Sequence, residues 1–244
     1  MLNADIELIE GIPAIYIKSI SALAIADLHL GYEAAMAKRG VFIPKVNLNH
    51  ILELLHEAYA GRRVKELIIV GDVKNEFSGV LGDEINELAE ISRLASSFGS
   101  SITVVKGNHD NFIDRVSRGT GVSVCDLKRS GGYLFAHGDK KIDRNCAETI
   151  IIGHEHPSIG VPWRSGRVEH VRCFLVGMHN GAKMIVLPAS GYFETGSDVN
   201  RDRGRARILS PMISATEMRK MRAIAVGYES TIDFGSVGDL TKLY

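Results

Sequence analysis

Five short apolar runs in this chain each end on Asp, Asn or His residues, and this pattern restricts the fold more than any other feature. The runs span residues 22–26, 67–70, 102–105, 133–136 and 149–152. Buried strands are apolar, and the first polar residues beyond their ends gather at one edge of the sheet. Because open α/β sheets hold their ligands at that edge, the pattern predicts one polar site assembled from five distant segments.

The polar residues after these runs suit a pair of divalent metal ions. They are, in order, Asp27-Leu28-His29, Gly71-Asp72, Gly107-Asn108-His109-Asp110, His137-Gly138 and Gly153-His154-Glu155-His156. Asp27 and His29 are two residues apart, as are His154 and His156, so in an extended chain both members of each pair project to the same side. Asp72 stands alone, and the two oxygens of its carboxylate can bridge two cations.

The charge of such a site favours a phosphate ligand. Two divalent cations bring about +4, while the carboxylates of Asp27 and Asp72 bring about −2. The remaining ligands bind as neutral groups; they are His29, Asn108, His137, His154 and His156. The excess positive charge attracts a phosphate and acidifies a metal-bound water, so that a bridging hydroxide can attack phosphorus in line.

His109 follows the ligand Asn108 but is surplus to the ligand count. As an imidazolium it can stabilise the transition state or protonate the leaving alkoxide. Asp110 comes next, and we expect its carboxylate to orient the His109 ring. His109 and Asp110 are therefore the candidate catalytic residues.

Strand and helix patterns alternate over the first 110 residues. Residues 6–17 read as a β-hairpin, and apolar residues at helical spacing predict a helix over 48–59. A second helix is expected between Asp83 as its N-cap and Gly99 as its end. The apolar face predicted for this second helix consists of Ile85, Leu88, Ile91, Ala95 and Phe98. This alternation is typical of a layered α/β fold.

After residue 120 the pattern changes to successive strands. Asn180-Gly181 is a strong hairpin-turn signal between the apolar runs 173–176 and 183–187. We therefore expect two sheets packed face to face with helices outside. The chain shows no long linker, repeat or low-complexity tract, which predicts a single domain over residues 1–244.

The composition gives little guidance on partners, because a neutral net charge does not exclude a local basic face. The 29 basic residues balance the 29 acidic ones, so there is no global electrostatic case for nucleic acid or an anionic membrane. No apolar run is long enough to span a bilayer, and the first residues lack the features of a signal peptide. The three cysteines are widely spaced and form no CxxC pair, which favours reduced thiols in a cytoplasmic protein. The sequence does not indicate an oligomeric state.

The five polar blocks resemble the motifs of the calcineurin-like metallophosphoesterase superfamily, which read D-x-H, G-D, G-N-H-D/E, a lone His, and G-H-x-H. All five occur here in order between residues 27 and 156. The resemblance implies a four-layer αββα sandwich with His109 as the catalytic histidine. It also implies that one metal is held by Asp27, His29, Asp72 and His156, and the other by Asp72, Asn108, His137 and His154.

A narrower resemblance, to archaeal SbcD-related and bacterial DNA-ligase-associated phosphoesterases, extends over most of the chain. It is carried by residues 27–31, 38–44, 71–74, 153–157, 187–189 and 198–200. One departure is Asn75, where relatives are expected to carry His. This association makes Mn2+ the preferred metal; mixed carboxylate, amide and imidazole ligation also suits iron or zinc.

The leading hypothesis is thus a phosphoesterase, with a phosphodiester of a nucleotide or nucleic acid favoured as substrate. Two alternatives share the fold: a non-catalytic scaffold, and a nuclease subunit that needs a partner ATPase. Four alternating arginines could line a phosphate backbone or protect an edge strand by charge, and the sequence leaves both open. They are Arg201, Arg203, Arg205 and Arg207.

Overall fold

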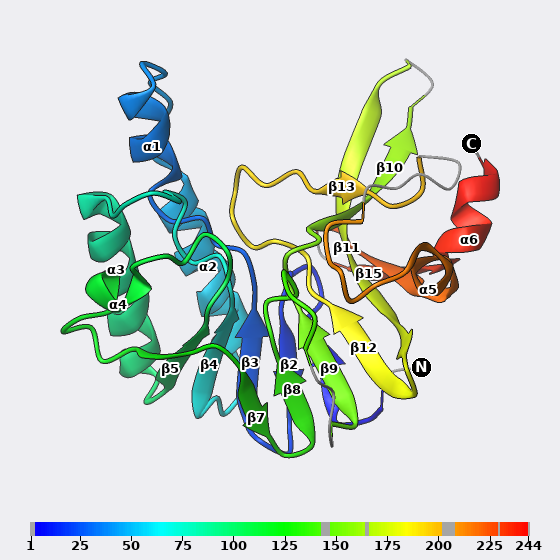
Figure 1. The fold of residues 1–244 in the computed structure, drawn as a ribbon, viewed down its shortest axis with the longest axis horizontal. Coiled ribbons are helices and arrows are strands. Elements are labelled where there is room, and N and C mark those ends of the chain that lie inside the picture. Colours follow the sequence, from blue (N-terminus) through cyan, green and yellow to red (C-terminus); the bar gives the residue numbers. More distant parts are fainter. Residues whose placement is uncertain (1–2, 143–146, 164–165, 202–207, 229, 244) are drawn as a thin grey trace.

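Two β-sheets bury the apolar runs between them, and helices cover both outer faces (Figure 1). The structure, a computed structural model, describes residues 3–142, 147–163, 166–201, 208–228 and 230–243. The layer between the sheets includes Ile68 and Val70 from the first sheet and Phe135 and Phe174 from the second, all with no exposed surface. This is the expected four-layer αββα sandwich.

The first sheet has the order β1-β2-β3-β4-β5-β6. Its strands are β1 (Ile6–Leu8), β2 (Ile15–Ile17), β3 (Ala22–Ile25), β4 (Glu66–Val70), β5 (Ser101–Val105) and β6 (Ser123–Cys125). The predicted hairpin is confirmed, because β1 and β2 pair antiparallel. Strands β3 to β6 run parallel, so the carboxyl ends of β3, β4 and β5 share one edge.

The second sheet has the order β13-β10-β11-β12-β9-β8-β7, with β14 and β15 added beside β11. Its strands are β7 (Lys128–Ser130), β8 (Tyr133–Phe135), β9 (Thr149–Ile152), β10 (Pro157–Pro162), β11 (Val168–His179), β12 (Ala182–Val186), β13 (Ser197–Asp198), β14 (Arg222–Val226) and β15 (Thr231–Ser236). Strands β8 and β9 are parallel and end at the same edge. Asn180 and Gly181 both have positive φ and join β11 to β12, as the hairpin signal predicted.

Two helices cover the outer face of the first sheet. They are α2 (Asn47–Tyr59) and α3 (Gly82–Ser97), and they pack Ile51, Leu55, Leu88 and Ile91 against it. The shorter helices are α1 (Tyr32–Lys38), α4 (Ile113–Val116), α5 (Ala215–Lys220), α6 (Val237–Leu240) and the 3-10 turn η1 (Thr241–Leu243). Of these, α5 and α6 cover the second sheet through Met218 and Leu240. No helix in the described ranges is long and apolar enough to cross a membrane.

The predicted start of α3 was wrong. The N-cap is Leu81, whose amide donates to the Glu84 carboxylate at 2.8 Å. Asp83 instead lies in the first turn of the helix. Ile85 and Phe98 were also misplaced, because they are 37% and 43% exposed and lie off the buried face.

Of the four alternating arginines, the structure describes only the first. Arg201 lies just beyond β13 and contacts Asp198 at 3.5 Å, while Arg203, Arg205 and Arg207 lie outside the described residues.

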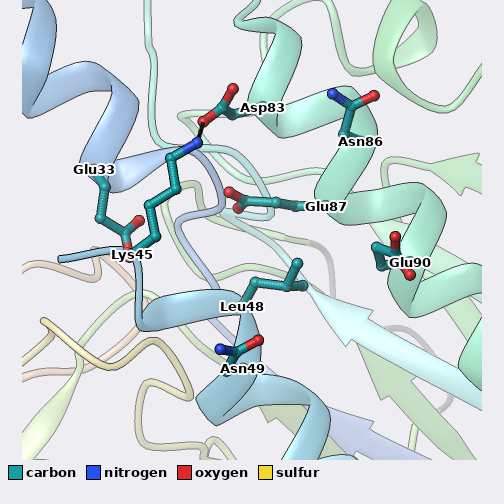
Figure 2. A pocket seen from close by; sticks show the side chains of 8 residues that line it. All are labelled: Glu33, Lys45, Leu48, Asn49, Asp83, Asn86, Glu87 and Glu90. Atoms are coloured by element: carbon teal, nitrogen blue, oxygen red, sulfur yellow. Dashed lines mark hydrogen bonds and ion pairs between the residues drawn. The ribbon is translucent and has the colours of Figure 1, made fainter.

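A cavity of about 310 Å³ lies beside α2 and α3 and gathers several carboxylates (Figure 2). Lys45 reaches Asp83 at 2.6 Å across this cavity. Glu87 is largely buried and accepts a 2.8 Å hydrogen bond from the amide of Gly31, in the turn after the Asp27-Leu28-His29 block. Burial raises the pKa of the Glu87 carboxyl to about 7, and the neighbouring charges of Glu33 and Asp83 add to this rise.

This raised pKa predicts a pH-dependent penalty on folding. Between pH 4.5 and 7 the folded protein binds more protons at Glu87 than the unfolded chain does, so Glu87 destabilises the fold as the pH rises through this range. Glu87→Gln keeps an acceptor for Gly31. The free energy of unfolding of Glu87→Gln, measured relative to wild type, should rise by about 1 kcal/mol from pH 4.5 to pH 8, after allowance for solvent screening. Urea unfolding at both pH values measures this difference. The half-exposed Glu90→Gln is the matched control, and equal behaviour of the two variants would refute the assignment.

Candidate metal centre

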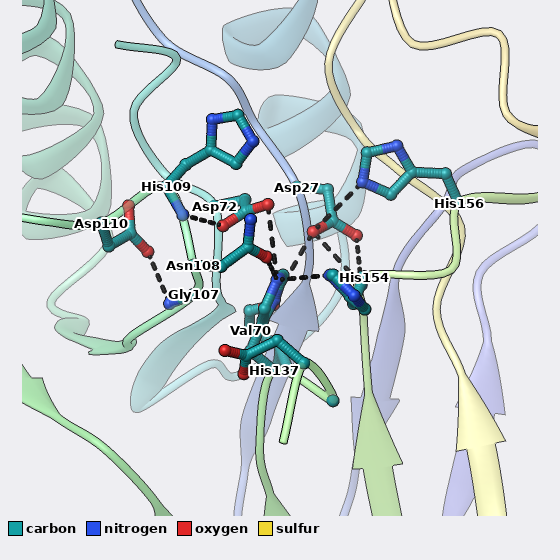
Figure 3. Close-up of polar contacts among 12 residues, drawn as sticks. Asp27, Val70, Asp72, Gly107, Asn108, His109, Asp110, His137, His154 and His156 are labelled. Carbon is teal, nitrogen blue, oxygen red and sulfur yellow. Dashed lines mark hydrogen bonds and ion pairs between the residues drawn. The ribbon is translucent and has the colours of Figure 1, made fainter. Parts of the chain in front are cut away.

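The polar ends of five strands meet at one edge of the sandwich. The blocks after β3, β4 and β5 come from the first sheet, and those after β8 and β9 come from the second. Figure 3 shows Asp72 between His109 and His137, and His156 facing Asp27. The structure thus brings together all of the predicted ligand residues.

The local backbone at these residues differs from the extended chain that we expected. Asp27, His29, Asp72, His154 and His156 all have positive φ, between 44° and 66°. Each ligand pair therefore reaches the site through a turn in the left-handed region. Non-glycine residues adopt this region at a cost of about 1–3 kcal/mol, and such residues cluster at functional sites.

The first group of potential ligands consists of Asp27, His29, Asp72 and His156. One ligand atom from each lies within 4.8 Å of the others. His156 Nε2 is 3.4 Å from Asp27 Oδ1. Neither ring nitrogen of His29 has a hydrogen-bond partner among the described residues, although both are buried. A buried imidazole with two unpaired nitrogens is costly unless something outside the protein binds it.

The second group is centred on His137 Nε2. This atom lies 3.0 Å from Asn108 Oδ1, 3.1 Å from His154 Nδ1 and 3.3 Å from Asp72 Oδ2. Ligand atoms of Asp72, His137 and His154 are again within 4.8 Å of one another. Asp72 belongs to both groups, which is the geometry of a bridging carboxylate.

The close carboxylates and imidazoles of the site shift one another's pKa values. Burial lowers the pKa of His137, but Asp72 and Asp27 outweigh it and raise the value to about 9. Burial likewise opposes protonation of His156, yet Asp27 and Glu194 raise its pKa to about 10. Burial disfavours the charged form of Asp72, but His137 holds the pKa of this carboxyl well below its usual range.

Two glycines allow the close approach of the ligands. A Cβ atom at Gly71 would lie 2.0 Å from Nδ1 of His137, and one at Gly107 would lie 2.2 Å from Oδ1 of Asp72. Together with the orphaned nitrogens of His29 and the mixed oxygen and nitrogen donors, this space fits two divalent cations of the kind that imidazole and carboxylate bind.

His109 lies beside the predicted metal ligands, and its ring contacts a main-chain carbonyl. Its Nδ1 is 3.0 Å from the carbonyl oxygen of Asn75, and its ring meets the edge of His29 at 5.1 Å between centroids. A carbonyl only accepts, so Nδ1 carries the proton of this bond. Nε2 is then the nitrogen that can exchange a proton with a bound ester. Asn75, the departure from the expected pattern, acts here through its backbone.

Asp110 does not have the contact with His109 that we expected. One oxygen accepts from the amides of Val73 and Lys74 at 2.9 and 3.2 Å, and the other accepts from Gly107 at 2.9 Å. Its carboxylate is buried among loop amides, and burial raises its pKa to about 6. Asp110 therefore braces the loops that carry Asp72 and Asn108, and the Asn75 carbonyl takes the position beside the His109 ring.

Sequence reasoning missed Glu194. A cavity of about 330 Å³ opens at the centre, and Glu194 lines it together with Leu209, Asn75 and the predicted residues. Glu194 Oε2 is 3.2 Å from His156 Nδ1. It lies in the segment between β12 and β13 with no motif around it, so no sequence signal marked it.

Similarity to one solved structure supports the fold. The chain is similar to the crystal structure of the nuclease MPE from Pseudomonas putida, with 18% identity, a TM-score of 0.63 and 94% of each chain covered. A protein of unknown function from Aquifex aeolicus, AQ665, matches at 19% identity and a TM-score of 0.36, over 59% of this chain and 81% of its own. No curated protein matches the chain in sequence.

A family model agrees with the motifs and with the geometry of the site. The model of the calcineurin-like phosphoesterases matches residues 20–170, a range that contains all five polar blocks. The chain belongs to the calcineurin-like phosphoesterase family.

Proposed function

We propose that this protein is a binuclear metal-dependent phosphodiesterase that acts on nucleic acid or a nucleotide. The observation that carries the proposal is the pair of ligand groups that share Asp72, with His109 beside them. Asp27, His29, Asp72 and His156 would hold one ion, and Asp72, Asn108, His137 and His154 the other. Manganese is the preferred metal, with iron or zinc as alternatives.

The bound ions would supply Lewis acidity toward the phosphate oxygens and a water of lowered pKa. The residues of the chain do the remaining work. The amide of His109 donates to Asp72 Oδ1 at 2.9 Å, so the backbone of this residue orients the bridging carboxylate. In its imidazolium form, with Nδ1–H bonded to the Asn75 carbonyl, the His109 ring can donate the proton on Nε2 to the leaving alkoxide and return to the neutral imidazole.

The nuclease name of the Pseudomonas putida structure supports a nucleic-acid substrate for this chain. The cavity at the site has a volume of about 330 Å³ and is lined mostly by polar side chains, which can face a charged phosphate group. We further propose that the protein is related to the SbcD-related and ligase-associated phosphoesterases, that residues 1–244 form a single domain, and that the protein is cytoplasmic. The two described cysteines, Cys125 and Cys173, are free thiols.

Metal binding should release protons at neutral pH. His137 and His156 have pKa values of about 9 and 10 without metal, so both rings are protonated at pH 7 and must lose a proton to bind a cation. Titration calorimetry with Mn2+ at pH 7, in two buffers of different ionisation enthalpy, should therefore show release of about two protons from these two rings. Two histidines of ordinary pKa would release only about half a proton in total. Release should decline as the pH rises through 9 and 10.

His109→Ala should separate catalysis from metal binding. Loss of a general acid lowers kcat by about 10²–10⁴-fold, while the Mn2+ stoichiometry stays that of wild type because the ligands are untouched. Turnover of a bis-aryl phosphodiester and metal analysis measure the two effects. The control is His179→Ala, whose ring pairs with Glu217 away from the site. Full activity in the His109 variant would exclude this role, and an inactive wild-type protein with bound Mn2+ would favour a scaffold.

The salt dependence of hydrolysis should identify the substrate class. For a nucleic-acid substrate, kcat/KM on an oligonucleotide falls steeply as the salt concentration rises, because phosphate contacts release counterions. A small aryl diester, assayed in parallel, should show little change. A flat response with both substrates would indicate a small physiological substrate.

A further inference from the structure

The ring of His156 lies between two carboxylates. Its Nε2 is 3.4 Å from Asp27 Oδ1, and its Nδ1 is 3.2 Å from Glu194 Oε2. The two nitrogens lie on different sides of an imidazole, so Glu194 contacts the side of the ring away from Asp27. An ionised carboxylate only accepts hydrogen bonds, so Nδ1 carries the proton of this contact and Nε2 presents its lone pair toward Asp27 when the ring is neutral.

Glu194 is held in place from the second sheet. Arg172, on β11, donates from Nε to the carbonyl of Glu194 at 3.1 Å. Its Nη2 donates to the carbonyls of Gly191 and Tyr192 at 2.5 and 3.2 Å. One half-buried guanidinium therefore fixes three carbonyls of the four-residue segment 191–194.

The same segment is also fixed by residues of helices α1 and α2. Phe193 stacks on Tyr32 of α1, with 4.5 Å between ring centroids and 15° between ring planes. The amide of Tyr192 donates to Asn47 Oδ1 at 2.7 Å. Asn47 in turn donates from Nδ2 to the carbonyls of Leu28 and His29 at 3.0 and 3.2 Å. Segment 191–194 is thus tied to the loop that carries a metal ligand.

We propose that Glu194 is a positioning residue that orients His156 for the first metal ion. The inference rests on the proposed function, because it requires a metal at this site. A carboxylate that accepts from the outer nitrogen of a ligating histidine fixes the tautomer and the ring direction, and loss of such a partner weakens metal binding about 10–100-fold. Glu194 acts through His156 and is not itself a ligand.

Mn2+ binding to a matched set of full-length variants tests this role, with calorimetry and electron paramagnetic resonance as readouts. Glu194→Ala should weaken one of the two ions about 10–100-fold. Glu194→Gln should retain most of the affinity, because its amide oxygen still accepts from Nδ1. Glu57→Ala removes an equal charge from an exposed position on α2 that lines the neighbouring groove, and it should match wild type. Should Glu194→Ala fail to fold, Glu194→Met fills the volume without accepting.

A double-mutant comparison separates positioning from simple charge attraction. If Glu194 acts through the ring, Glu194→Ala should weaken Mn2+ binding no further in a His156→Ala background. An equal loss in both backgrounds would overturn the proposal, as would wild-type affinity in Glu194→Ala. The latter result leaves the proposed function intact. A wild-type protein that binds no divalent cation would overturn both.

Discussion

The contact between Asp72 and His137 joins the two sheets, and the functional site depends on it. Asp72 follows β4 of the first sheet, and His137 follows β8 of the second, with 3.3 Å between Oδ2 and Nε2. Asp27 makes a second link, because its carboxylate accepts from the amide of His154 at 3.1 Å. The apolar layer that holds the sheets face to face therefore also sets the distance between the two halves of the site.

The site is unfavourable by itself, and the rest of the fold offsets that cost. Five of the predicted ligand residues have left-handed backbone conformations, and the nitrogens of His29 are buried without a partner in the described part of the chain. These features persist because each strand end is fixed by its neighbours; for example, the amides of Asp27 and His29 donate to the carbonyls of Gly71 and Asp72. A bound cation would reduce the repulsion between the carboxylate oxygens and imidazole nitrogens that meet here. Metal binding should therefore raise the free energy of unfolding.

Buried carboxylates outside the predicted ligand set accept hydrogen bonds from backbone amides of the loops. Glu33 accepts from the amides of Val46 and Asn47, Glu87 accepts from Gly31, and Asp110 accepts from three amides near Asp72. Loop amides have no strand partner, and a buried amide without an acceptor is costly. Acidic side chains thus hold the loops that position the candidate metal centre, and this role explains why the Asp110 carboxylate of the Gly107-Asn108-His109-Asp110 block contacts loop amides and not the His109 ring.

The sequence by itself determined the strands and the polar residues at their ends, which the structure brings together as candidate ligands, because apolar runs and the residues that follow them are local features. It also placed the hairpin turn at Asn180-Gly181 and the end of α3 at Gly99. Only the tertiary structure decided what the surrounding side chains contact. Leu81 replaces Asp83 as the N-cap, Asp110 braces amides instead of His109, and Glu194 reaches His156 across 38 residues of sequence. These contacts depend on how the sheets, helices and loops pack, and no local pattern encodes a distance between segments far apart in the chain.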